Sequence, residues 1–213
     1  MRRRHFCLLI LLPTLLVAVW PHAAFARGAT AADAEACNLT ADELEVYSTT
    51  IQELLLKDHE DTARVILREK TSVGYPPGMA AMKSTKENER EVLDSTSVEI
   101  RDDFDKKNKA QCKLDPQIQP VDKIQFITFV EEQVNLPRAN WKAFYKKYPG
   151  ATGYTMLSRI GFNSGRNEAL IYLGNSCELL CGHGYLVLLR KHKGQWKVWK
   201  QGTIWVASQN PAD

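Results

Sequence analysis

The chain has 213 residues, with 28 basic and 25 acidic side chains and a formal net charge of +3. Residues 1–26 contain three arginines and no acid, so the other 187 residues carry as many acids as bases and are formally neutral. This balance argues against a strongly cationic nucleic-acid-binding protein. A hydrophobic content of 44% argues against disorder of the whole chain, and the length suits one domain with a sizeable core.

The first 26 residues have the three parts of a secretory signal peptide. Arg2–Arg4 are followed by an apolar stretch, Phe6–Trp20, and by the small-residue cleavage site Ala24–Ala26. The alternative is an uncleaved anchor, which the short apolar stretch disfavours. We therefore predict cleavage after Ala26, a periplasmic or secreted mature protein, and no stable membrane span after cleavage.

The cysteines agree with export. Four of the five remain after cleavage, and an even number in an oxidising compartment indicates disulfides. Four cysteines allow three connectivities. The close pair Cys177 and Cys181 most simply closes its own small loop, which leaves Cys37 with Cys112.

Residues 27–39 are predicted to be a flexible leader, 40–208 a single domain, and 209–213 a tail. Thr40–Glu43 reads as a capping box, which predicts a helix from Ala41 to about Lys57. A strand is expected over 63–72 and a break at 74–78. The polar residues 78–95 are expected to form a loop.

Three further elements are predicted before residue 150. Thr96–Glu99 offers a second capping box for a helix to about Asn108, and Lys113–Val121 reads as a connector. Alternating apolar residues predict a strand over 124–129. Asn140 is a suitable cap for a short helix that ends before Pro149.

The rest of the chain has a β pattern. Two hairpins are expected, with strands 154–162 and 168–174 around a turn at 163–167, and strands 184–191 and 195–206 around a turn at 192–194. Gly202 suggests a bulge. The expected fold class is α+β, with N-terminal helices packed on a C-terminal antiparallel β-meander. A nuclear transport factor 2-like or cystatin-like fold fits this element order, which by itself implies no function.

Charge divides along the chain. Residues 27–137 sum to −8 and residues 138–213 to +8. One interpretation is that acidic helices lie on a basic sheet and the two fields cancel. The other is that a surface with Arg190, Lys191 and Trp199 faces outward and holds an anionic glycan, a lipid headgroup or an acidic protein.

The run Cys177–Gly184 is the most distinctive segment. It is interpreted first as a disulfide loop between two strands. The alternatives are a zinc or copper site made by Cys177, Cys181 and His183, and a redox or cysteine–histidine nucleophile pair. The spacing matches no standard zinc or redox motif, so we expect neither a metal nor a cofactor.

Arg159 lies in an apolar strand pattern and must find a partner or point outward. Glu168 across the hairpin is one candidate partner, and anion binding is the other interpretation. We find no nucleophile elbow, P-loop or dinucleotide fingerprint. The candidate binding residues are Arg159, Asn163, His183, Arg190, Lys191 and Trp199.

Several motifs resemble a family of uncharacterised exported bacterial proteins. They are Phe144–Gly150 (FYKKYPG), Leu157–Asn163 (LSRIGFN) and Cys181–Gly184 (CGHG). The likeness covers about residues 44–207 and implies an exported α+β domain without an assigned activity. Glu178 and Leu179 replace the glycine that often follows the first cysteine in that family.

The sequence therefore favours a non-catalytic binding module for an envelope component, an anionic ligand or a protein. A hydrolase acting on envelope material, which uses His183 with Arg159 as an anion holder, is the first alternative. A metal-binding protein that uses Cys177, Cys181 and His183 is the second.

Overall fold

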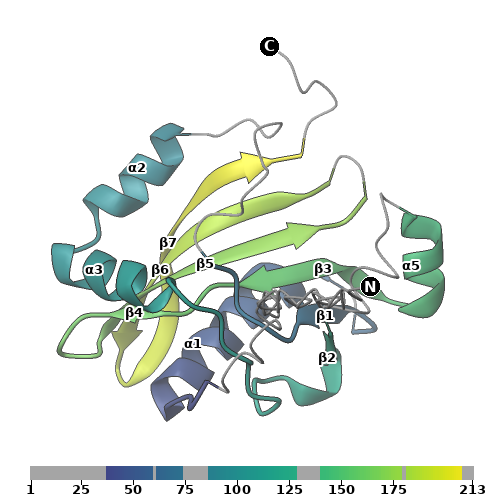
Figure 1. Ribbon diagram of the computed structural model, residues 1–213, viewed down its shortest axis with the longest axis horizontal. Helices are drawn as coiled ribbons and strands as arrows, with labels where there is room; N and C mark the ends of the chain where they lie inside the picture. Colours follow the sequence, from purple (N-terminus) through teal and green to yellow (C-terminus); the bar gives the residue numbers. More distant parts are fainter. Residues whose placement is uncertain (1–36, 60, 74–85, 129–139, 179–180, 208–213) are drawn as a thin grey trace, which may run out of the picture. The chain divides into compact units, whose positions relative to one another are not determined.

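The computed structural model describes residues 37–59, 61–73, 86–128, 140–178 and 181–207 (Figure 1). All of them belong to residues 34–213, which form one compact unit. The predicted signal peptide, most of the predicted leader, the break at 74–78 and the tail lie outside the described residues. Among the described helices, none is long and apolar enough to cross a membrane.

The centre of the fold is a seven-stranded mixed sheet with the order β2-β1-β3-β5-β6-β7, in which β4 pairs with β5. The strands are β1 (Arg64–Arg68), β2 (Ile124–Ile127), β3 (Ala151–Leu157), β4 (Gly161–Phe162), β5 (Glu168–Ser176), β6 (His183–His192) and β7 (Gln195–Val206). Strand β1 is parallel to both β2 and β3, and the other pairs are antiparallel. The α+β class and the antiparallel C-terminal strands are confirmed. The sheet as a whole is mixed, because β1 and β2 extend the antiparallel C-terminal strands with parallel pairs.

Within the part of the chain that the structure describes, four helices accompany the sheet: α1 (Ala41–Ile51), α2 (Lys86–Asp94), α3 (Val98–Lys107) and α5 (Trp141–Lys147). Helix α1 continues into a π-helical turn, η1 (Gln52–Leu56), and a 3₁₀ turn, η2 (Val121–Lys123), precedes β2. The predicted cap of α1 is confirmed, because the Thr40 hydroxyl accepts from the Glu43 N–H while the Glu43 carboxylate accepts from the Thr40 N–H. The Asn140 cap of α5 is confirmed as well.

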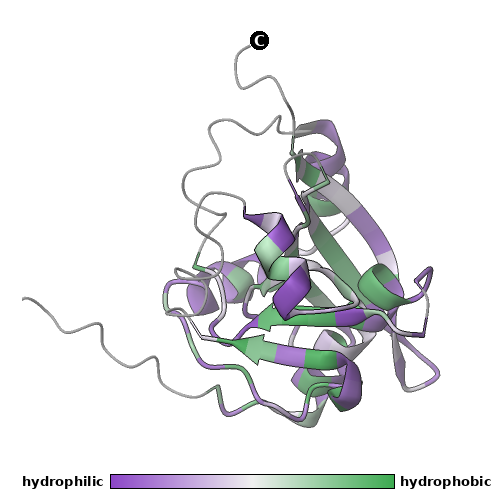
Figure 2. Ribbon diagram, turned by 90° about the vertical axis from the view of Figure 1, so that its right-hand side faces the viewer, coloured by the Kyte–Doolittle hydropathy of each residue, from purple (hydrophilic) through white to green (hydrophobic). Residues whose placement is uncertain are grey.

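The helices lie on both faces of the sheet (Figure 1). Side chains alternate along a strand, so neighbouring residues enter different cores. Ile171 and Val187 pack with α1, while Leu170 and Leu186 pack with α2 and α3, and Ile66 packs with α5. In Figure 2 the helices carry hydrophilic and hydrophobic residues side by side, as expected of elements with one face toward the sheet.

Three local expectations were wrong. Residues 86–94 of the expected loop form α2. The helix over 98–107 is capped by Ser97, whose hydroxyl accepts from the Ile100 N–H, while the Thr96 hydroxyl donates to the Val92 carbonyl. The expected strand 154–162 is divided into β3 and β4, because the Ser158 hydroxyl accepts from the Tyr172 N–H in place of a regular ladder bond.

Gly202 is not the bulge of β7. It pairs regularly with Leu186, and the register shifts instead at Trp199 and Ile204, each of which is the extra residue between two paired neighbours. A Cβ on Gly202 would lie 2.3 Å from the carbonyl oxygen of Asn88 in α2. Gly202 therefore permits the close approach of α2 to β7.

Candidate functional site

Asn163 organises the turn between β4 and β5. Its side-chain oxygen accepts hydrogen bonds from the N–H groups of Asn167 (3.0 Å) and Glu168 (3.2 Å), and its side-chain nitrogen donates to the Asn167 side chain. The Lys191 N–H donates to the Asn167 carbonyl, which ties this turn to the end of β6. The predicted hairpin is thus confirmed, and its turn lies next to Arg190 and Lys191.

Glu168 pairs with Arg190 and not with Arg159. The two residues are directly opposite each other on β5 and β6, and the Arg190 Nε lies 2.5 Å from a Glu168 carboxylate oxygen. The expected pairing of Arg159 with Glu168 is wrong because the register places Arg190 at that position.

Arg190 also stacks on Trp199. The guanidinium carbon lies 3.3 Å from the centre of the indole ring, and the Lys200 ammonium approaches the same ring to 5.7 Å. Trp199 is the extra residue of a bulge in β7 and is 47% exposed. The structure therefore holds a large aromatic side chain at the surface beside a cation.

These residues surround a hollow of about 520 Å³ at the ends of the two hairpins. We call the hollow together with the neighbouring Trp199 the hairpin-end site. The lining residues are Asn163, Asn167, Glu168, Arg190 and Lys191. Four of the six residues predicted from the sequence are brought together here.

Asp42 of α1 lies at the edge of this site and contacts three residues of the C-terminal half. Its carboxylate accepts hydrogen bonds from the Lys191 ammonium, from Arg166 (3.1 Å) and from the Trp196 indole N–H (3.3 Å). Glu91 of α2 likewise pairs with Lys200. These contacts join the acidic and basic halves of the chain and agree with the interpretation in which acidic helices lie on a basic sheet.

The stability of the protein should fall in acid partly through Asp42. Burial alone raises the pKa of Asp42, but the hydrogen bonds from Lys191, Arg166 and Trp196 outweigh it, and the pKa is lowered from 3.8. The unfolded chain therefore binds more protons below about pH 4, so this contribution is present above pH 4 and is lost as the pH falls through the folded pKa. Urea unfolding between about pH 2.5 and 6 should show a shallower acid loss for Asp42→Asn than for the wild type. Identical slopes would contradict this role.

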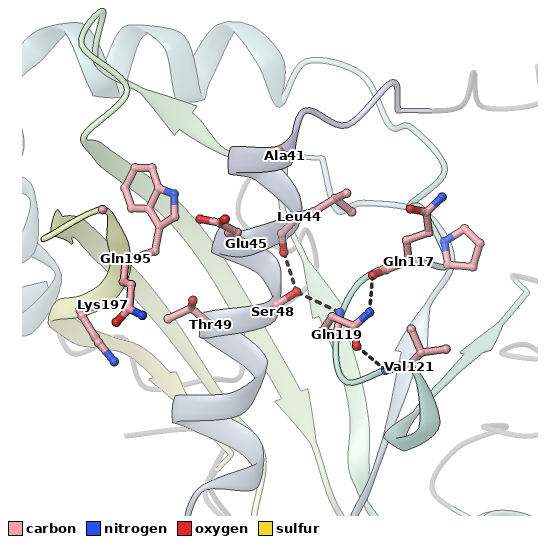
Figure 3. Close-up of a pocket in the computed structure, with 13 residues that line it drawn as sticks. Ala41, Leu44, Glu45, Ser48, Thr49, Gln117, Gln119, Val121, Gln195 and Lys197 are labelled. Atoms are coloured by element: carbon pink, nitrogen blue, oxygen red, sulfur yellow. Dashed lines mark hydrogen bonds between the residues drawn. The ribbon is translucent and has the colours of Figure 1, made fainter.

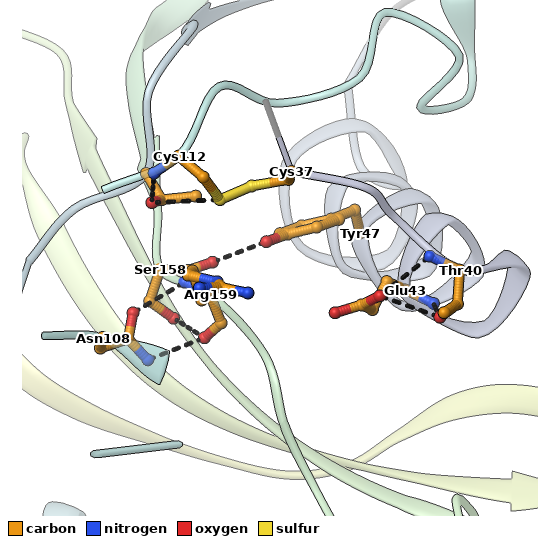
Figure 4. Close-up of a disulfide and its surroundings, with 9 residues drawn as sticks. Cys37, Thr40, Glu43, Tyr47, Asn108, Cys112, Ser158 and Arg159 are labelled. Atoms are coloured by element: carbon orange, nitrogen blue, oxygen red, sulfur yellow. Dashed lines mark hydrogen bonds between the residues drawn. A yellow bond between two sulfur atoms is a disulfide. The ribbon is translucent and has the colours of Figure 1, made fainter. Parts of the chain in front are cut away.

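Arg159 lies outside the hairpin-end site, between β3 and β4 (Figure 4). Its backbone N–H donates to the Asn108 side chain and its carbonyl accepts from it, at 2.8 and 3.0 Å. The neighbouring Ser158 carbonyl accepts from the buried Tyr47 hydroxyl. Burial, with a smaller contribution from Glu43, raises the pKa of that hydroxyl far above its ordinary value.

His183 begins β6, seven residues before Arg190 and thus about 23 Å away along the strand. It pairs with Asn175 and Val206, and its ring lies 4.7 Å from that of Tyr185. Burial lowers the pKa of His183, partly opposed by a hydrogen bond to the Cys181 backbone. The structure does not bring His183 into the hairpin-end site.

Both predicted disulfides are confirmed. Cys37 is bonded to Cys112 (Figure 4), and Cys177 to Cys181. The second bond consumes the two thiolates that a zinc or copper site at this loop would require. Within the described ranges, no group of three or more His, Cys, Asp or Glu side chains is arranged to hold a metal ion.

A larger hollow of about 800 Å³ lies over the outer face of α1 and was not anticipated from the sequence (Figure 3). The connector before β2 forms one wall and the start of β7 the other. The Ser48 hydroxyl joins α1 to the connector, because it donates to the Leu44 carbonyl and accepts from the Gln119 N–H. We call this hollow the α1 groove; its lining includes the glutamines at 117, 119 and 195.

Comparison with known proteins adds no relationship: no family model, curated protein or solved structure matches this chain significantly.

Proposed function

We propose that this chain is an exported binding protein that holds a component of the cell envelope at the hairpin-end site. The observation that carries the proposal is the hollow of about 520 Å³ beside the exposed, cation-stacked Trp199. Two amides, a carboxylate and two cationic residues line the hollow from three segments of the chain, and the Trp199 indole lies beside it, stacked against Arg190. Such a set of convergent polar groups beside an aromatic ring is typical of recognition sites.

The export part of the proposal rests on the N-terminal sequence and the disulfides. Residues 1–26 read as a cleavable signal peptide, and the resemblance to exported bacterial proteins points the same way. The two disulfides are consistent with an oxidising, extracytoplasmic location. N-terminal sequencing of the protein recovered from its native compartment should begin at Arg27; an intact Met1 would contradict export by cleavage.

The binding part is favoured over hydrolysis by the arrangement of the polar groups. Arg159 and His183, the two residues of the hydrolase alternative, contact different elements. The charged groups at the hairpin-end site form ion pairs with one another: Glu168 pairs with Arg190, and Asp42 pairs with Lys191. A nuclear transport factor 2-like or cystatin-like fold also remains a proposal, supported by the packing of α1 across antiparallel strands.

The proposal is tested by cosedimentation of the purified protein with envelopes isolated from the source organism. Arg190→Ala removes the contact to both Glu168 and Trp199 and should lower the bound fraction at least several-fold. Gln195→Ala, an exposed substitution in the α1 groove, is the matched control and should bind like the wild type. Equal binding by all three proteins, or loss in the control alone, would contradict the proposed site.

A further inference from the structure

The cations of the hairpin-end site are already compensated. Arg190 faces Glu168, and Lys191 faces Asp42, which also accepts from Arg166. An anionic ligand would have to compete with these carboxylates for their cations and would meet the negative charge of Glu168 in the same hollow. The structure thus disfavours the anionic ligand that the basic C-terminal half suggested.

The same groups keep hydrogen-bonding capacity for hydroxyls. A guanidinium carries five N–H donors and a carboxylate about four lone-pair sites, so an ion pair between them leaves several of each. A hydroxyl both donates and accepts, and it can therefore bind beside Arg190 and Glu168 without breaking their pair. The amides of Asn163 and Asn167 border the same hollow.

Trp199 supplies the apolar part of the surface. The bulge places the indole at the surface, and the Arg190 guanidinium stacked on it limits its freedom to move. Arg190 covers one face of the ring, so a ligand can meet only the exposed part of Trp199, which is 47% exposed. A rigid aromatic side chain of this kind offers apolar surface next to polar groups at low entropic cost. This combination matches a sugar ring, which has a flat face of C–H groups and a rim of hydroxyls.

We infer that the hairpin-end site binds a neutral hexose polymer, with Trp199 against the C–H face of one sugar and Arg190, Glu168 and Asn163 toward its hydroxyls. The inference rests on the proposed function and names the class of envelope component. A neutral ligand makes no charge–charge interaction with the site that salt could screen. Its affinity should therefore hardly depend on ionic strength.

The test is isothermal titration calorimetry of the full exported protein with cellohexaose and with laminarihexaose, two neutral glucose oligomers, at low and high salt. At least one should bind, with a Kd that changes less than about twofold between roughly 50 and 500 mM NaCl. Trp199→Ala should weaken it about tenfold or more, as expected when a central aromatic contact is removed. Trp199→Phe should keep part of the affinity, and Gln195→Ala should keep all of it.

Polygalacturonate and phosphatidylglycerol vesicles are the anionic comparison probes. Salt-sensitive binding to either, lost in Arg190→Ala, with no response to the neutral oligosaccharides would overturn the inference and leave the proposed function standing. Oligosaccharide binding that survives Trp199→Ala but is lost in Gln195→Ala would overturn it in favour of the α1 groove. Absence of binding to every probe and to isolated envelopes would overturn both proposals.

Discussion

Replacing Cys37 and Cys112 together with alanine should lower the free energy of unfolding by about 4.5 kcal/mol, the value that the chain-entropy relation gives for their separation of 75 residues. The bond ties the residue three positions before the α1 cap to the segment that follows α3. Around it the Cys37 N–H donates to the Lys113 carbonyl, and the Cys112 N–H donates to the Thr71 hydroxyl. Without the bond, these contacts and those of Asp42 with Lys191 and Trp196 would still hold the start of α1, but the long loop of the unfolded chain would no longer be restrained.

The second disulfide is the internal control. Cys177 and Cys181 are four residues apart, so the same relation gives only about 2 kcal/mol for the double alanine variant. Urea unfolding of both double variants under identical conditions compares the two losses directly. A loss for Cys37 and Cys112 no larger than that for Cys177 and Cys181 would show that the long loop is already restrained by other contacts.

The elements that local sequence specifies were predictable. The capping box at Thr40 and the helical spacing of Leu44, Tyr47 and Ile51 lie within α1 itself, so the local sequence is enough to predict the helix. Helix α2 has no such apolar spacing, because most of its residues are charged or polar. Val92, which is fully buried, stands among them. Its Glu, Lys and Arg residues have good helix propensity, but a polar helix owes its place to tertiary packing.

The candidate site was predictable only in its parts. The turn at Asn163 and the cations of β6 are visible in the sequence, but their meeting depends on the strand register that sets Glu168 opposite Arg190. The exposure of Trp199 depends on a bulge, which pairing decides. Asp42 is 149 residues from Lys191, and nothing local connects them.

Substituting Gly202 with alanine should lower the free energy of unfolding by about 3 kcal/mol, near the upper end for overpacking. The added Cβ would lie 2.3 Å from the Asn88 carbonyl oxygen and 2.9 Å from a methyl of Val92. The oxygen belongs to backbone and cannot rotate away, so α2 as a whole has to move off β7. That movement would expose Val92, which is fully buried.

Two glycines in turns separate this steric effect from the general effect of losing a glycine. At Gly165 the nearest atoms to a new Cβ are 3.6 Å away and the backbone is not left-handed, so alanine should change stability by less than about 0.5 kcal/mol. At Gly194 no atom is within 4 Å but φ is +82°, so alanine should cost about 1–2 kcal/mol through backbone strain alone.

Urea unfolding of the three variants should rank them Gly202, Gly194, Gly165 in order of decreasing loss of stability. Hydrogen exchange in Gly202→Ala should be accelerated most in α2. If Gly202→Ala were as mild as Gly165→Ala, α2 would not pack against β7 as described, and the ion pair of Glu91 with Lys200 would lose its structural basis.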